Sequence, residues 1–142
     1  MNTQREPLTP ALQNELLAAA TLAYEHAHAP YSNFRVGAAI LLETGEVFSG
    51  CNVENASYGL TNCAERTAIF SAVAARGSKQ VRIRAVAVAN DRGVACSPCG
   101  ACRQVISEFG PDAEILYLGP HGIQSSSIRL LLPDCFTSDS LA

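Results

Sequence analysis

The chain lacks the segments that would direct it to a membrane. No apolar run is long enough and free enough of charge to cross a bilayer. The N-terminus, residues 1–7, lacks the apolar stretch of a signal peptide. We therefore expect a cytoplasmic protein with no membrane partner. In that compartment, the six cysteines are expected to be reduced rather than paired in disulfides.

Basic charge is also scarce. Ten lysines and arginines stand against thirteen acidic residues, which gives a formal net charge of -3. Arg82 and Arg84 form the only basic pair at strand spacing. A nucleic-acid partner needs a basic patch that this composition does not supply. The sequence favours a small neutral substrate and predicts no nucleic-acid partner.

Internal repeats, low-complexity tracts and domain linkers are absent as well. The 142 residues are 48% hydrophobic, enough to bury a core and suited to one compact domain. We expect a single domain over 1–142, with a loose leader at 1–8 and a tail at 137–142.

The hydrophobic pattern predicts an alternation of helices and strands. Thr9 and Pro10 signal a helix start, and Gly45 signals a hairpin turn. Nearly continuous apolar runs indicate strands covered on both faces. The expected fold is α/β, a three-layer α/β/α sandwich with a mixed sheet of about five strands. The sequence predicts helices at 10–28, 63–75, 98–109 and 127–132, and strands at 36–42, 46–53, 83–89 and 114–118.

Three cysteines and a glutamate carry the strongest chemical signal. Cys63 and Cys99 each fall in the first turn of a predicted helix, where the helix dipole stabilises a thiolate. Cys102 follows Cys99 by three positions, so both share a helix face. Three thiolates can hold zinc and leave the fourth tetrahedral position open for water. Glu65 is placed to move protons there, in the manner described for zinc deaminases.

Other interpretations of these residues remain open. The three cysteines could form a structural zinc site or pack as small apolar residues, and Cys51, Cys96 or Cys135 could supply a fourth thiolate. Ordinary packing is the simpler expectation for those last three. Arg66 is a candidate to offset thiolate charge through hydrogen bonds to sulfur, since three thiolates outweigh the charge of Zn²⁺. Alternatively, Arg66 is a solvated helix residue with no such role.

A second polar pair lies near the end of the strand at 46–53. Asn52 and Glu54 are two positions apart, so their side chains are expected on the same face. An amide and a carboxylate pointing together suit recognition of sugar hydroxyls. A solvated strand end would carry the same pair.

Four blocks of sequence together resemble the short, homotetrameric cytidine deaminases. The resemblance runs from about residue 11 to Phe136, and these blocks in this order are more specific than one Cys-x-x-Cys. The blocks are residues 34–39 (FRVGAA), 50–59 (GCNVENASYG), 63–68 (CAERTA) and 98–104 (PCGACRQ).

The resemblance implies a role for each matching residue. Cys63, Cys99 and Cys102 would hold one zinc ion per chain, and Glu65 would shuttle protons. The substrate contacts would be Asn52 and Glu54 on the ribose 3′-hydroxyl, Phe34 on the pyrimidine ring, the backbones of Ala64 and Ser97 on the base edge, and Tyr58 and Phe136 reaching into a neighbouring subunit's pocket.

The implied reaction is hydrolytic deamination of free cytidine and deoxycytidine in pyrimidine salvage. Zinc-activated hydroxide would attack C4, and Glu65 would protonate N3 and the leaving amine. Two alternatives are deamination of a related aminopyrimidine nucleoside or antibiotic, and a non-catalytic binding module stabilised by zinc. Asn52 with Glu54 argues for a nucleoside, and an open zinc position beside Glu65 argues for turnover.

Overall fold

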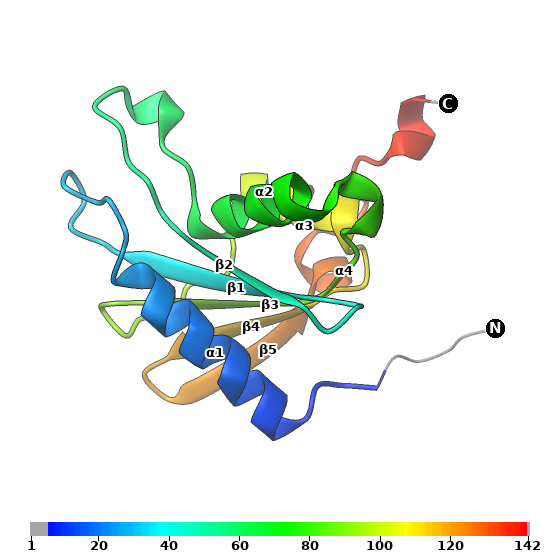
Figure 1. The fold of residues 1–142 in the computed structure, drawn as a ribbon, viewed down its shortest axis with the longest axis horizontal. Helices are drawn as coiled ribbons and strands as arrows, with labels where there is room; N and C mark the ends of the chain where they lie inside the picture. Colours follow the sequence, from blue (N-terminus) through cyan, green and yellow to red (C-terminus); the bar gives the residue numbers. More distant parts are fainter. Residues whose placement is uncertain (1–5, 142) are drawn as a thin grey trace.

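A computed structural model describes residues 6–141 and contains a five-stranded mixed sheet between two layers of helices (Figure 1). The strands lie in the order β2-β1-β3-β4-β5. Only β3 and β4 are parallel; the other neighbouring pairs are antiparallel. The strands are β1 (Val36–Leu42), β2 (Val47–Cys51), β3 (Ile83–Asn90), β4 (Glu114–Gly119) and β5 (Gly122–Ser127).

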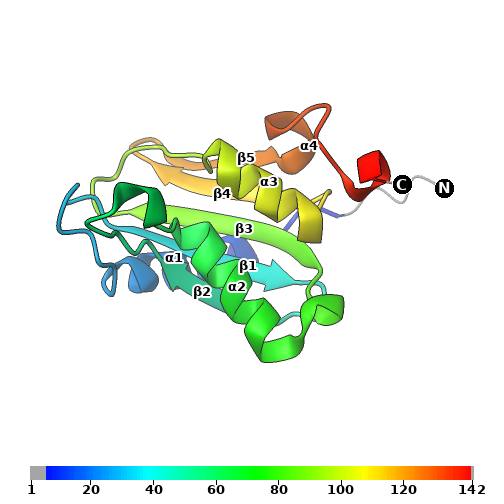
Figure 2. The same cartoon turned by 90° about the horizontal axis from the view of Figure 1, so that it is seen from above.

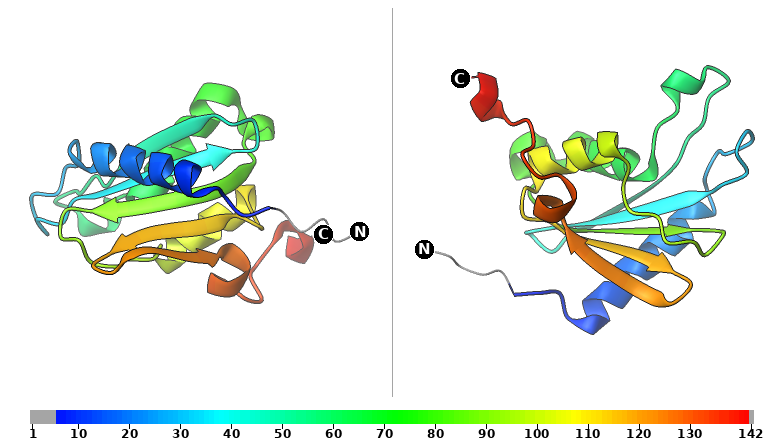
Figure 3. Two further views of the ribbon diagram at one scale, coloured as in Figure 1. Left: turned by 90° about the horizontal axis from the view of Figure 1, so that it is seen from below. Right: turned by 180° about the vertical axis from the view of Figure 1, so that it is seen from behind.

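The helices divide unequally between the two faces of the sheet. Helix α1 (Pro10–Tyr24) covers one face. The left view of Figure 3, which is seen from below, shows this helix lying in front of the sheet. Helices α2 (Ala64–Arg76) and α3 (Gly100–Phe109) lie side by side on the opposite face (Figure 2), and the short α4 (Ile128–Leu131) follows β5. The expected three-layer sandwich is confirmed. Among the helices of residues 6–141, none combines the length and apolar character needed to cross a membrane.

Alternation along the central strands builds a core on each face. In β1, Ile40 packs on the α2 and α3 side, whereas Leu41 packs on the α1 side. The α1 face of β3 carries only alanines, which lets the helix approach closely. Gly37 marks the tightest point, because a Cβ there would lie 1.9 Å from the Ala20 carbonyl oxygen. The small residues therefore set the spacing of this layer.

The structure corrects several predicted boundaries. Helix α1 ends at Tyr24, not near His28, because the His28 N–H donates to the Asn52 carbonyl and His28 forms a bridge with Val53. Strand β5 was not predicted: it is rich in serine and largely exposed at the sheet edge. Leu8 was expected in the leader but is buried in the α1-side core. Residues 1–5 of that leader lie outside the described residues.

Candidate active site

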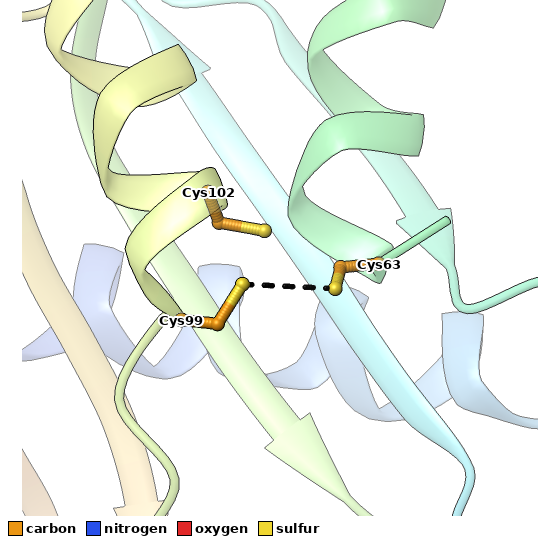
Figure 4. Close-up of side chains that lie close together, drawn as sticks. All are labelled: Cys63, Cys99 and Cys102. Atoms are coloured by element: carbon orange, nitrogen blue, oxygen red, sulfur yellow. Dashed lines mark hydrogen bonds between the residues drawn. The ribbon is translucent and has the colours of Figure 1, made fainter. Parts of the chain in front are cut away.

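The three predicted cysteines converge where two helices begin (Figure 4). Cys63 is the residue before α2, Cys99 the residue before α3, and Cys102 lies buried in the first turn of α3. Cys63 itself, and neither Thr61 nor Asn62 before it, takes the N-cap position of α2. Neither cysteine cap uses its side chain to cap the helix, so both sulfurs are free for other bonds.

The sulfur geometry fits a zinc ion. The Sγ atoms of Cys63 and Cys99 are 3.8 Å apart, and all three sulfurs lie within 4.8 Å of one another. Tetrahedral coordination at Zn–S distances of about 2.3 Å requires sulfur separations of roughly 3.8 Å. Within residues 6–141, none of Cys51, Cys96 and Cys135 joins this cluster. Three protein ligands leave one coordination position for a reactant, as in catalytic zinc sites.

Electrostatics prepares the cluster for a cation. The neighbouring Cys102 thiol, followed by Arg66 and Cys99, lowers the pKa of Cys63 to about 5. The Cys63 thiolate in turn raises the pKa of Cys102, with burial adding to the effect, and metal binding to this thiol would release its proton. Arg66 donates from Nη2 to the Cys63 Sγ over 3.3 Å, and its own pKa is raised by that thiolate. Nε of Arg66 is buried without a partner.

Glu65 lies beside the cluster but is not part of it. Its side chain is 4% exposed, and burial raises the pKa of the carboxyl group. A carboxyl group that is easily protonated can both accept and donate a proton near neutral pH. Glu65 also faces a cavity, which is where such chemistry can take place.

That cavity has a volume of about 280 Å³ and two contrasting walls. The metal wall comprises Cys63, Ala64, Glu65 and Cys99, all at helix starts. The loop wall comprises residues 31–36 with Asn52, and Phe34, Val36 and Asn52 reach the cavity from it. The remaining lining residues are Thr61, Asn62, Val88, Cys96 and Ser97.

Hydrogen bonds across long sequence separations hold the loop wall. The Asn52 amide is buried and donates to the Phe34 carbonyl at 2.8 Å, while its oxygen accepts from the Val36 N–H at 2.9 Å. The Glu54 carboxylate accepts from the N–H groups of Tyr31 and Ser32 and from the Ser32 hydroxyl. The Ser32 hydroxyl bond lowers the pKa of Glu54 most, so the carboxylate is ionised.

The predicted site residues are only partly gathered by one chain. Phe34, Asn52, Ala64 and Ser97 line the cavity, whereas Glu54 does not. Tyr58 and Phe136 also lie outside its lining and are 75% and 58% exposed. Val36, Thr61, Asn62, Val88 and Cys96 also line the cavity. The sequence predicts strands at Val36 and Val88 and ordinary packing for Cys96. No motif indicated that these five reach the cavity.

An α/β/α sandwich with three cysteines at two helix starts and a buried glutamate defines a zinc-binding domain of the deaminase type. The model of the cytidine and deoxycytidylate deaminase zinc-binding region matches residues 11–118. The chain therefore belongs to that family. The family match and the fitting sulfur geometry together support one zinc ion per chain.

Individual relatives agree with this assignment. A cytidine deaminase of Sporosarcina psychrophila is 46% identical, with 90% of this chain and 93% of the relative covered. The crystal structure of a cytidine deaminase from Burkholderia pseudomallei superposes with a TM-score of 0.80 at 48% identity, covering 91% of this chain and all of that one. A blasticidin-S deaminase of Bacillus cereus is a weaker match, 38% identical and covering 72% of this chain and 76% of the relative.

Proposed function

We propose that the chain hydrolyses the exocyclic amine of free cytidine and deoxycytidine, yielding uridine or deoxyuridine and ammonia. One observation carries this proposal: a single cavity is bounded by two cluster cysteines and the buried Glu65 on one side and by Phe34 and Asn52 on the other. Reactive groups and groups suited to a nucleoside thus face the same space. Such an enzyme would act in pyrimidine salvage in the cytoplasm.

The chain's own residues divide the chemistry. Bound zinc would supply Lewis-acid chemistry that lowers the pKa of a water molecule. Glu65 would accept a proton from the attacking water and deliver it to N3 of the ring, then take the remaining proton from the new C4 hydroxyl and pass it to the leaving amine. Its burial keeps bulk water from competing for those protons. The balance is one water consumed and one ammonia released, with the C4–N bond broken and a C4–O bond formed.

The loop wall would supply most of the nucleoside contacts, with backbone groups of Ala64 and Ser97 added from outside it. Phe34 would pack on the pyrimidine ring, while the backbones of Ala64 and Ser97 would read the base edge. Asn52 and Glu54 would hold the ribose 3′-hydroxyl. Glu54 already accepts three hydrogen bonds from Tyr31 and Ser32, so a sugar hydroxyl would add to or replace one of them. The loop at 31–32 and the sugar would then share one carboxylate.

The cavity favours a neutral nucleoside over two competitors. None of its lining residues, all within the described part of the chain, is a lysine or arginine that could pair with a phosphate, so a nucleotide is a poorer fit. An antibiotic substrate, the activity named for the Bacillus cereus relative, is less favoured. That relative is less identical and matches less of the chain than the cytidine deaminase relatives.

Ultraviolet absorbance of the pyrimidine ring tests the activity. Zinc-loaded protein is mixed separately with cytidine, deoxycytidine, deoxycytidylate and blasticidin S. Turnover of the two nucleosides, abolished by a chelator and restored by zinc, is expected. Faster turnover of deoxycytidylate or blasticidin S than of the two nucleosides would mean that this compound, and not a free nucleoside, is the preferred substrate. No turnover of any of the four by zinc-loaded protein would remove the deaminase assignment.

The proposed working unit is a homotetramer in which neighbouring chains complete each pocket. Tyr58 and Phe136 project outward, and Leu130 is 76% exposed, although Leu131 packs against the core. Such apolar side chains suit a contact with another copy. The Gln104 amide donates to the Phe136 carbonyl at 3.0 Å, which fixes the segment that carries the ring.

Light scattering at a series of dilutions measures the mass, and Phe136→Ala tests the borrowed ring. The expected result is a tetramer whose variant keeps its mass and its zinc but binds cytidine more weakly. A fully active monomer would overturn the assembly, and unchanged kinetics in a tetrameric Phe136→Ala variant would overturn the borrowing.

A further inference from the structure

Arg92 makes a set of contacts at the cavity that no sequence motif indicated. Its guanidinium lies over the Phe34 ring, with Cζ 4.9 Å from the ring centroid. The same group donates from Nη2 to the Ser32 carbonyl at 2.9 Å and to the Asn33 carbonyl at 3.3 Å. One side chain therefore holds both a ring that lines the cavity and the backbone just before it.

The turn that presents Arg92 is itself well braced. Asn90, buried at the end of β3, accepts from the N–H groups of Arg92 and Val94 and donates to the Val94 carbonyl at 2.7 Å. Asp91 accepts from the N–H and Nε of Arg35, in the segment that leads into β1. The arginine thus projects from a fixed turn rather than from a free loop.

The segment that Arg92 holds is held from the other side by Glu54. The carboxylate binds the N–H groups and hydroxyl at Tyr31 and Ser32, whereas Arg92 binds the carbonyls of Ser32 and Asn33. An anion and a cation thus grip the donor and acceptor groups of the same short segment. Charged hydrogen bonds are the stronger kind, so each partner adds to the order of the loop wall.

We infer that Arg92 is a positioning residue for substrate binding: it keeps Phe34 and the 31–34 segment in the arrangement that receives the pyrimidine nucleoside. This inference rests on the proposed deaminase function. Arg92 touches no reacting group and lies outside the metal wall. Its removal should therefore weaken binding of substrate and product alike and leave the chemical step unaltered.

Kinetics with cytidine and inhibition by uridine test the inference, with Arg92→Ala as the variant. Loss of the stacking and of the two hydrogen bonds should raise KM and the uridine inhibition constant together by about three- to tenfold, with kcat changed less than about twofold. The KM and the uridine inhibition constant of Arg92→Lys should lie between those of the wild type and of Arg92→Ala, because lysine keeps the charge but loses the planar group that stacks on a ring.

Arg76 offers a matched control. Its guanidinium lies over the Phe48 ring at 5.6 Å and binds Glu46, and none of these three residues lines the cavity. Arg76→Ala therefore removes an arginine–phenylalanine contact and an ion pair without touching the loop wall, and should leave KM and the uridine inhibition constant unchanged. A thermal melt of each variant checks that all remain folded at the assay temperature.

A double-mutant cycle separates positioning from general destabilisation. In a Phe34→Leu background, Arg92→Ala should raise KM by a smaller factor than in the wild type, since the stacked ring is already gone. Wild-type turnover of cytidine with unchanged KM in Arg92→Ala would overturn the inference and leave the proposed function standing. A fall in kcat with no change in KM would also overturn it, as would the same fold increase in KM in both backgrounds. Absence of wild-type turnover would instead count against the proposed function.

Discussion

The two walls of the cavity are held in different ways. The metal wall sits at the starts of α2 and α3, where helical hydrogen bonds fix the backbone and Glu65 is buried. The loop wall depends on side chains distant in sequence: the Glu54 carboxylate accepts from the Ser32 N–H, and Arg92 donates to the Ser32 carbonyl. Groups proposed for the chemistry therefore lie on rigid elements, and groups proposed for recognition lie on a braced loop. This division predicts that metal-wall changes lower kcat and loop-wall changes raise KM.

The largest expected effect comes from removing a cluster cysteine. Cys102→Ala should lose most of the bound zinc and all measurable turnover, because two remaining thiolates hold the metal poorly. Metal content by atomic emission, measured beside activity, checks this prediction. Cys135→Ala is the control: that cysteine lies outside the cluster and should leave zinc and turnover intact. Full zinc retention in Cys102→Ala would remove Cys102 from the ligand set.

Arg66 comes next, because it acts on the metal wall through a sulfur atom. Arg66→Gln removes the cation that donates to the Cys63 Sγ and should lower kcat by about 10- to 100-fold, the range for residues that support metal ligands. KM should change little, and zinc retention should weaken. Steady-state kinetics on zinc-saturated protein measures both constants. A kcat equal to that of the wild type would mean that the helix starts alone stabilise the thiolates.

Glu54 should give the smallest effect of the three and the opposite kinetic signature. Glu54→Gln keeps one acceptor oxygen but removes the charge that holds Tyr31 and Ser32, so KM should rise by about three- to tenfold with kcat nearly unchanged. Ser32→Ala is the companion variant: it removes a hydroxyl that donates to the same carboxylate and accepts from the Phe34 N–H, but it leaves the charge of Glu54 in place and should shift KM less. A drop in kcat without a change in KM would break the division between the walls.

The metal wall could be predicted from the sequence because its signals are local. Cys99 and Cys102 are spaced by one helical turn, and the predicted helix starts at 63 and 98 lie one and two residues before the observed starts of α2 and α3. The loop wall could not be predicted in the same way. The bonds that hold it from elsewhere in the chain join residues 16 to 60 positions apart, and nothing local to Arg92 indicates Phe34 as its partner.

The elements of the fold likewise differ in how well the local sequence predicts them. Strand β1 matches its predicted bounds, because a strand buried on both faces has a continuous apolar run. Strand β5 was missed because it pairs only with β4 at the sheet edge, and its serines give no apolar alternation. The end of α1 was misplaced because His28 pairs with the backbone of Asn52 and Val53, a contact set by tertiary structure.

In the proposed division of labour, the metal wall performs the reaction while the loop wall supplies most of the nucleoside contacts. Glu65→Gln tests it most directly, with zinc content, cytidine affinity and turnover measured on the same preparation. The variant should hold one zinc per chain and bind cytidine about as tightly as the wild type. It should lose at least about 10²- to 10⁴-fold in turnover, the usual contribution of a general acid–base group. Near-normal turnover with zinc and binding intact would mean that the metal wall does not perform the reaction through Glu65.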